Sequence, residues 1–365
     1  MPSRRCSAVT ADDSLKTSIT RIGSDIWIST LNIQETKKII GAMERDASID
    51  VLQFVDGDDR PVWEDMNFSP NNLGQLFEFS KKIMQRSTQS LIVCIAPTHR
   101  NITTAALLLG SHLIVRERLD LSVVSEVFSR LSAQFIPFSE THGDDREALT
   151  VFDCWAAVYR ATKEGWLDFS DEPRPGTIDM QEYIHYNCTA NGELHVVVPD
   201  KLLAFPCPFD LPKDLVWMDE GGSRRFSAAY YADIFTDFDV SVAVCCARAD
   251  EDVPYKPAAL AQHGAAVEAL LADARSGGLL ASVDRLLTLA RAAPGAIALH
   301  GLGAWEEGLL VSAYLIRLHG FPAREALAWA RMAHPPGPAA APAFELHAAA
   351  APSAGDGSGV PVAAE

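Results

Sequence analysis

Residues 295–334 read GAIALHGLGAWEEGLLVSAYLIRLHGFPAREALAWARMAH, and this stretch decides the fold. The apolar run 295–300 predicts a buried strand, and a glycine-containing loop follows it. The segments 306–319 and 322–334 predict two helices, the second with Pro322 at its first position, where a missing N–H is tolerated. The stretch is therefore a strand, a loop and two helices joined by a turn.

A second stretch, residues 90–132, repeats this order of elements. The apolar run SLIVCIA at 90–96 predicts a strand, and a polar turn follows it at 97–101. Helices are expected at 102–118, which ends in basic residues that suit the helix dipole, and at 121–132. A repeated unit of this kind predicts an α/β protein of two tandem, related domains, each a central mixed sheet flanked by helices.

Shorter patterns supply the remaining elements and the boundaries. Strands are predicted at 25–31, 51–56, 193–198, 201–205 and 240–247, and helices at 147–166, 178–186 and 279–293. The predicted organisation is a flexible N-terminus at 1–20, an N-terminal domain at 21–168, a linker with a short helix at 169–192, a C-terminal domain at 193–335 and a disordered tail rich in Ala, Pro and Gly at 336–365.

Composition limits the classes of partner. The 365 residues carry 31 Lys and Arg against 48 Asp and Glu, a net charge of −17, so nucleic acid and anionic membranes are not expected partners. No stretch reaches the ~18 apolar residues of a membrane span, and no apolar run follows Arg4 and Arg5 as in a secretion signal. Seven cysteines without metal-type spacing indicate a reducing compartment. We expect an intracellular protein with no metal and no cofactor.

Four segments follow one another in the order and spacing of a known family. They are AALLLG at 105–110, YIHY at 183–186, VPDKLLAF at 198–205 and the stretch at 295–332. Together they resemble the dual-specificity protein phosphatases of the mitotic-exit type, the cell-division-cycle-fourteen family, over about residues 20–335.

The resemblance implies two tandem dual-specificity-phosphatase-like domains, of which the first is non-catalytic and the second catalytic. It implies phosphoprotein substrates, with a preference for phosphoserine followed by proline, bound in a groove between the domains. It also implies a location in the nucleus, the cytoplasm, or the centrosome or cilium.

In that family a cysteine thiolate attacks phosphorus, an arginine six residues later binds the phosphate oxygens, and a nearby aspartate protonates the leaving oxygen. The corresponding loop here departs from this pattern. His300 is followed by Gly301, Leu302 and Gly303 where the family has its cysteine and small residues, and no cysteine follows Cys246. Counting back from the glycine at 308 places the arginine position on Glu306, a group that repels phosphate. Phosphate binding at this loop is expected to be lost.

Asp273 is the candidate general acid. Gap-free counting from His300 places the acid position on Ala274, one residue away. Two interpretations stay open, a carboxyl group that faces the pocket and a solvated surface carboxylate, which is the usual situation of aspartate.

A competing site lies at Cys94-Ile-Ala-Pro-Thr-His-Arg100, where five residues separate a cysteine from an arginine at the end of a strand. The spacing suits a phosphatase loop, but Pro97 removes an amide donor and the loop has no glycine. Cys94 is then either a nucleophile assisted by Arg100 or a buried thiol at the end of a strand, and we favour the second.

The sequence therefore favours a pseudophosphatase that binds protein or phosphoprotein partners without hydrolysis. Two alternatives stay open, an active phosphatase that uses Cys94 and Arg100, and a structural component of a larger assembly. The sequence leaves the oligomeric state undetermined.

Overall fold

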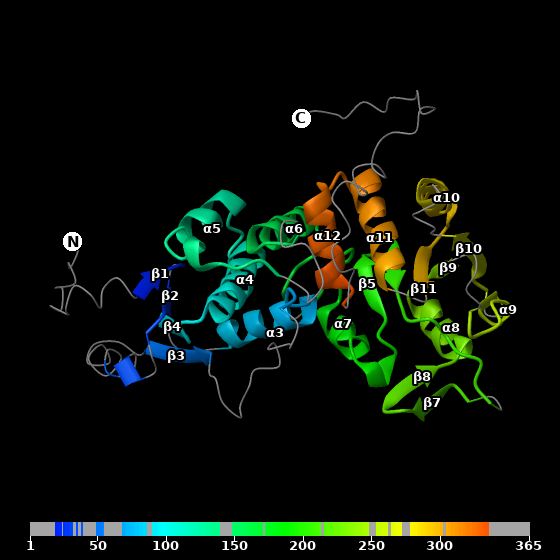
Figure 1. Ribbon diagram of the computed structural model, residues 1–365, viewed down its shortest axis with the longest axis horizontal. Coiled ribbons are helices and arrows are strands. Elements are labelled where there is room, and N and C mark those ends of the chain that lie inside the picture. Colours follow the sequence, from blue (N-terminus) through cyan, green and yellow to red (C-terminus); the bar gives the residue numbers. More distant parts are fainter. Residues whose placement is uncertain are drawn as a thin grey trace, which may run out of the picture.

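The computed structural model describes residues 19–23, 25–31, 34–35, 38, 49–54, 68–85, 90–138, 148–170, 172–212, 215–247, 253–261, 264–271, 278–301 and 304–335. The two larger β-sheets, of four and five strands, lie toward opposite ends of the long axis of the molecule, and helices fill the space between them (Figure 1). We call the elements from β1 to α6 the N-terminal half and those from α7 to α12 the C-terminal half.

The N-terminal sheet has four strands in the order β1-β2-β4-β3. Strand β1 is antiparallel to β2, and β4 is parallel to both β2 and β3. Their bounds are β1 (Ile19–Arg21), β2 (Ile26–Ser29), β3 (Ile49–Phe54) and β4 (Ser90–Ile95). The apolar run at 90–96 thus forms an interior strand, as its continuous hydrophobicity predicts.

The helices of this half are α3 (Leu73–Met84), α4 (His99–Val115), α5 (Leu121–Val127) and α6 (Val151–Lys163). Thr150 and Asp153 form a capping box that starts α6, since each side chain bonds the backbone N–H of the other residue. Helices α4 and α6 pack closely at Gly110, where a Cβ would lie 2.8 Å from a ring carbon of Trp155. The indole of Trp155 donates to the carbonyl of Ala106 at 3.1 Å.

The C-terminal sheet has the order β10-β9-β11-β6-β5. Strand β11 is its central strand and is parallel to β6 and β9, while β5 is antiparallel to β6. The strands are β5 (His195–Val198), β6 (Leu202–Ala204), β9 (Val240–Ala247), β10 (Ala266–Leu271) and β11 (Ala296–Gly301).

Helices and a hairpin complete this half. They are α7 (Met180–Tyr186), α8 (Ala228–Asp237), α9 (Ala258–Ala261), α10 (Gly278–Ala292), α11 (Ala304–His319), α12 (Ala323–Ala333), and the hairpin of β7 (Trp217–Glu220) and β8 (Ser223–Phe226).

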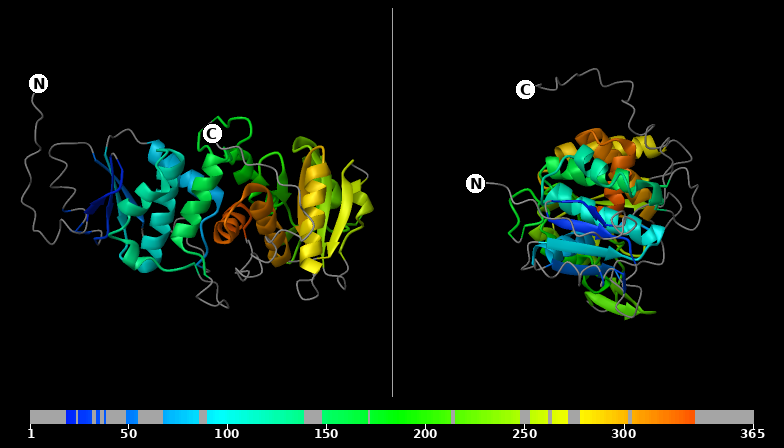
Figure 2. Two further views of the ribbon diagram at one scale, coloured as in Figure 1. Left: turned by 90° about the horizontal axis from the view of Figure 1, so that it is seen from above. Right: turned by 90° about the vertical axis from the view of Figure 1, so that its left-hand side faces the viewer.

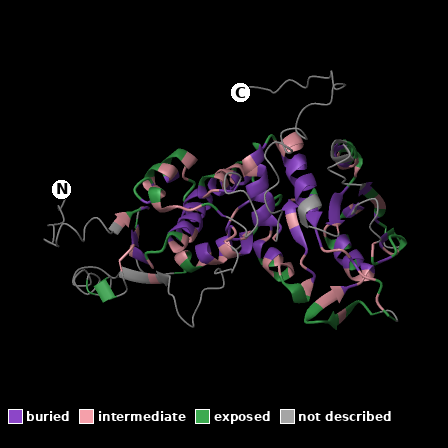
Figure 3. Cartoon of the chain, viewed as in Figure 1, coloured by how far each residue is buried: buried purple, intermediate pink, exposed green. Residues whose placement is uncertain are grey.

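The two halves share one continuous hydrophobic core, whose buried residues run from β2 through α4, α6 and α12 to β11 (Figures 1 and 3). Figure 2 shows the helices between the two sheets from above. Two ion pairs cross the contact between α6 and α12: Arg324 with Asp153 at 2.8 Å, and Arg160 with Glu325 at 2.8 Å. The hydroxyl of Tyr183 on α7 also donates to main-chain carbonyls at the end of α12.

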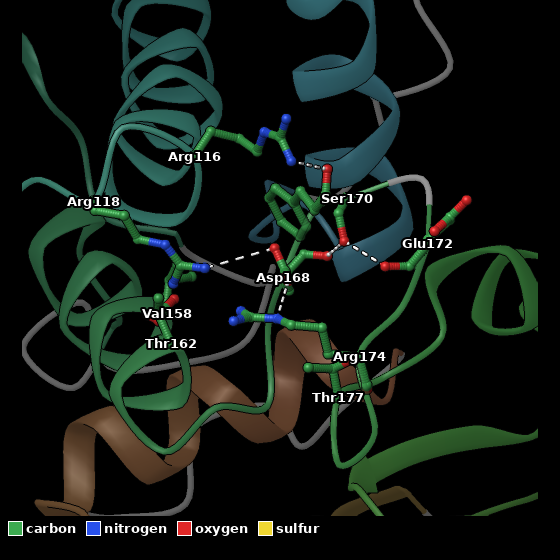
Figure 4. A network of polar contacts seen from close by, with 10 residues as sticks. Arg116, Arg118, Val158, Thr162, Asp168, Ser170, Glu172, Arg174 and Thr177 are labelled. Atoms are coloured by element: carbon green, nitrogen blue, oxygen red, sulfur yellow. Dashed lines mark hydrogen bonds and ion pairs between the residues drawn. The ribbon is translucent and has the colours of Figure 1, made fainter.

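The chain between the halves is held by an arginine network (Figure 4). Arg118 and Arg174 both pair with the carboxylate of Asp168, and Arg116 donates to the carbonyl of Phe169 at 2.8 Å. The connection that begins at Asp168 is therefore tied to the turn that follows α4, because Arg118 of that turn pairs with the Asp168 carboxylate.

The prediction of a mixed α/β protein with helix-flanked sheets is confirmed. Several elements were predicted inaccurately. The segment 121–132 is a shorter helix α5, which ends at Val127 and is followed by a separate 3-10 turn at 132–134, and α4 begins three residues before its predicted start. Helices α3 and α8 and the hairpin were not predicted. Both predicted terminal segments, 1–20 and 336–365, lie wholly or almost wholly outside the described residues.

No helix in the described ranges has both the length and the hydropathy that crossing a membrane requires.

Candidate functional site

The candidate site lies at the C-terminal end of β11, where the chain leaves the centre of the sheet and enters α11. This is where open α/β sheets bind ligands. His300 is fully buried there, and its Nε2 lies 2.8 Å from the hydroxyl of Tyr255. Burial lowers the pKa of His300 to about 3, so the imidazole is neutral near pH 7. Its Nδ1 has no hydrogen-bond partner within the described part of the chain.

Gly301 occupies the position at which the resemblance places the nucleophilic cysteine. It is the last residue of β11 and pairs with Cys246 of β9. A Cβ on Gly301 would lie 2.6 Å from the carbonyl oxygen of Cys246 and 3.0 Å from Oε1 of Glu307. Real Cβ atoms are essentially never as close to another atom as that first distance, so this position has no room for any side chain.

Glu307 is a buried carboxylate directed toward this position. Its side chain is 6% exposed, and Oε2 lies 3.1 Å from Nε2 of His334. Glu307 stands six residues after Gly301, which is the spacing that the resemblance gives to the phosphate-binding arginine. Counting back from the glycine at 308 gives that position to Glu306, because the loop is one residue short, whereas counting forward from His300 gives it to Glu307.

Two thiols lie within electrostatic range of Glu307. Burial, to which neighbouring Cys245 and Glu307 add, raises the pKa of Cys207 to about 12. Burial, with Glu307 again adding to it, raises the pKa of Cys245 to about 11. Both groups are therefore protonated thiols near pH 7, whereas a nucleophilic cysteine needs surroundings that lower its pKa.

The other loop residues are only partly accounted for. Leu302, Gly303 and Asp273 lie outside the described residues, and Glu306 belongs to α11 but its side chain is not described. The assignment of Asp273 as the general acid therefore remains a prediction.

Cys94 lies near the end of β4 and is 3% exposed. It packs with Ile92 and Trp27, whereas the alternate residues Leu91 and Val93 face the main core. Arg100, in the first turn of α4, places its guanidinium 5.0 Å from the ring centroid of Phe68. A thiol buried to this extent must first become accessible before it can attack a phosphate ester.

Cys245 and Cys246 are neighbours on β9, and both are buried. Among the described residues, no three or more His, Cys, Asp or Glu side chains are arranged to hold a metal ion.

No family model matches the chain. The chain is 26% identical to dual specificity protein phosphatase CDC14AB of Danio rerio over 291 residues, which cover 76% of this chain and 45% of that protein. It is 25% identical to human CDC14C, with 74% of this chain and 59% of that protein covered, and 25% identical to human CDC14A, with 76% and 46% covered.

Its curated relatives are CDC14 dual-specificity phosphatases. The resemblance inferred from the sequence is thereby confirmed. The chain spans about half the length of the CDC14 proteins that it matches.

Solved structures that resemble the chain are tyrosine or dual-specificity phosphatases. Tk-PTP in its active form aligns with a TM-score of 0.32 at 16% identity, over 43% of this chain and 95% of that one. Human DUSP28 aligns with a TM-score of 0.31 at 20% identity, over 43% of this chain and 92% of that one.

Proposed function

We propose that this chain is a CDC14-like pseudophosphatase, which binds protein or phosphoprotein partners and does not hydrolyse phosphate esters. One observation carries the proposal: the nucleophile position is Gly301, whose missing Cβ would collide with the carbonyl of Cys246. Without a thiol at this point no phosphocysteine intermediate can form.

The charge of the loop supports the same proposal. A phosphate-binding arginine attracts the substrate, whereas Glu307 at that position has a carboxyl group that lies 3.1 Å from His334. Whether ionised or protonated, this group supplies no positive charge, so the loop lacks the attraction that an arginine gives to phosphate. The raised pKa values of Cys207 and Cys245 give no replacement nucleophile near pH 7.

Tandem organisation is part of the proposal. We assign the two sheets to two phosphatase-like domains, of which the first is non-catalytic, and we place the protein in the nucleus, the cytoplasm, or the centrosome or cilium. The CDC14 relatives support the tandem organisation, since each alignment covers about three quarters of this chain and this chain contains both sheets.

Hydrolysis of a generic aryl phosphate and of a peptide with phosphoserine followed by proline tests the proposal. We expect no turnover above the buffer rate from the wild-type chain. Cys94→Ser, Cys207→Ser and Cys245→Ser serve as matched variants. Vanadate-sensitive turnover that disappears only in Cys94→Ser would instead support the alternative of an active phosphatase that uses Cys94 and Arg100.

A scaffold role has one specific observation in its favour. Leu215, Val216 and Trp217 are consecutive large apolar residues at the start of the hairpin, with exposed fractions of 47%, 43% and 44%. Contiguous exposed apolar surface is typical of protein contacts. If this segment joins the chain to a larger assembly, the wild-type chain in a cell extract should elute from a sizing column with that assembly. The Val216→Ser/Trp217→Ser double variant should instead elute at the size of the free chain.

A further inference from the structure

Three buried side chains and the half-buried Asn187 form a continuous hydrogen-bonded row beneath the candidate site. Glu307 Oε2 lies 3.1 Å from Nε2 of His334, and Nδ1 of His334 lies 2.9 Å from Nδ1 of His195. Nε2 of His195 lies 2.9 Å from Oδ1 of Asn187. Glu307, His195 and His334 are at most 7% exposed, so water does not compete for the two bonds that join them.

The row joins four separate parts of the C-terminal half. Glu307 lies in the first turn of α11, His334 follows α12, His195 begins β5 and Asn187 follows α7. The hydroxyl of Tyr183 donates to carbonyls at the end of α12, beside the same row. The contacts therefore fix the start of α11 to the region where the two halves meet.

The direction of the hydrogen bonds follows from the Asn187 oxygen. An amide oxygen only accepts, so His195 must donate from Nε2. Burial and the neighbouring His334 lower the pKa of His195 well below its usual value, so this ring is neutral and its Nδ1 accepts. His334 must consequently donate from Nδ1 to His195.

One additional proton is then required between His334 and Glu307. If the carboxylate is ionised, His334 must donate from both nitrogens and is an imidazolium. If the carboxyl group is protonated, it donates to a neutral His334. Both forms hold the same number of protons. After loss of that proton, His334 has a single N–H for two acceptors, and one contact brings two lone pairs together.

We propose that Glu307, His334, His195 and Asn187 form a proton-dependent clasp that fastens the start of α11 to the end of α12 and opens when the Glu307–His334 pair loses one proton. This function of the clasp does not depend on whether the chain hydrolyses phosphate esters.

Titratable and charged groups on the elements packed against the clasp include Glu193 before β5, Tyr183 on α7, Cys207 after β6, Cys245 on β9 and Arg331 on α12. Burial raises the pKa of Tyr183, and the two thiols have pKa values of about 11 or above, so these groups stay neutral near pH 7. Arg331 stays charged. Burial raises the pKa of Glu193 from 4.5, although His334 opposes the shift.

The sign of the pH dependence follows from the proton count. In the folded chain, the Glu307–His334 pair holds one proton. In the unfolded chain, the same two residues lose that proton once the pH passes the ordinary pKa of histidine, about 6.5. The unfolded state then binds fewer protons, so stability falls as pH rises. A difference of one proton raises the equilibrium constant for unfolding by up to about tenfold per pH unit.

Glu307→Gln in the full chain tests the clasp. The glutamine amide can donate to Nε2 of a neutral His334, which then donates to His195, so every bond is made without an extra proton. We expect urea unfolding between about pH 6 and 9 to show a loss of stability with rising pH in the wild type and a flatter dependence in Glu307→Gln.

Glu325→Gln is the matched control, because Glu325 lies on α12 and pairs with Arg160 rather than with a histidine. This variant should keep the wild-type pH dependence. If Glu307→Gln kept the wild-type pH dependence of stability, the proposal would be overturned, since the row would then need no extra proton. This would be the case if the amide nitrogen of Asn187, rather than its oxygen, faced His195, because every hydrogen bond of the row would then run in the opposite direction.

Nitrogen-15 spectra of the histidine rings provide a readout that requires no mutation at Glu307. At about pH 6, His195 should be the neutral Nε2–H form, and a proton should be shared between His334 and Glu307. The His334 signals, assigned with His334→Asn, should change on raising the pH. Finding His195 in the Nδ1–H form throughout would overturn the proposal even if Glu307→Gln failed to fold.

Discussion

Gly301 illustrates how one missing side chain determines the chemistry of a loop. A Cβ at this position would lie against both the Cys246 carbonyl and the Glu307 carboxyl group. The position therefore holds no thiol, and the group six residues later is a carboxyl group rather than a cation.

Gly301→Cys should destabilise the protein and should not restore hydrolysis. Forcing a Cβ against the Cys246 carbonyl, 2.6 Å away, displaces β11 or β9, and overpacking of this kind costs about 1–3 kcal/mol. Urea unfolding measures the loss. Gly301→Ala is the control, since it adds the same Cβ without sulfur and should lose a similar amount. A stable Gly301→Cys variant that turns over aryl phosphate would contradict the argument.

At the scale of elements, the contact between α4 and α6 depends on a glycine. Gly110→Ala should reduce stability because the new Cβ would collide with the Trp155 ring. The collision should outweigh the advantage of about 1 kcal/mol that alanine normally has over glycine inside a helix. We expect a net loss of about 1–3 kcal/mol in thermal unfolding. The double variant Gly110→Ala/Trp155→Leu should lose less than the sum of its two single variants. Additive losses would show that the two residues do not meet.

The long apolar elements could be predicted from the sequence because burial on both faces leaves continuous hydrophobic runs. Strands β4, β9 and β11 were found in this way, and β9 at its observed bounds. Helix α3 was missed even though Asn72 and Gln75 form a capping box before it, a signal that the sequence contains. The hairpin was missed because its strands are short and polar.

The candidate site was predictable only in part. The local pattern predicted a strand that ends at His300, and β11 continues one residue further, to Gly301. The role of His334 could not be predicted, because its partners Glu307 and His195 are 27 and 139 residues away and no local spacing relates them. Such contacts depend on how α12 packs against β5, which is a property of the tertiary fold.

At the scale of the whole molecule, Asp153 and Arg324 join the two halves and make their contact sensitive to acid. Burial alone would raise the pKa of Asp153, but hydrogen bonds from Arg324 and Thr150 outweigh it and lower the pKa below 3.8. A depressed pKa stabilises the folded state above the ordinary value of about 3.9, and this contribution is lost as pH falls through the folded value.

Asp153→Asn should therefore lower stability at pH 7 and weaken the acid dependence below about pH 4. Urea unfolding at pH 7 and at acid pH measures both effects. Asp168→Asn is a control carboxylate that also pairs with arginines but lies in the connection rather than between α6 and α12. If Asp153→Asn kept the full acid dependence, the ion pair with Arg324 would not contribute to it.

The close approach of Gly301 to β9 also limits what a single substitution can achieve at this position. Replacing the glycine alone by cysteine would strain the strand and place a thiol beside a carboxyl group, so it would not by itself rebuild a phosphatase loop. A loop able to hold a phosphate group would need β11 to stand further from the Cys246 carbonyl and a different side chain at Glu307.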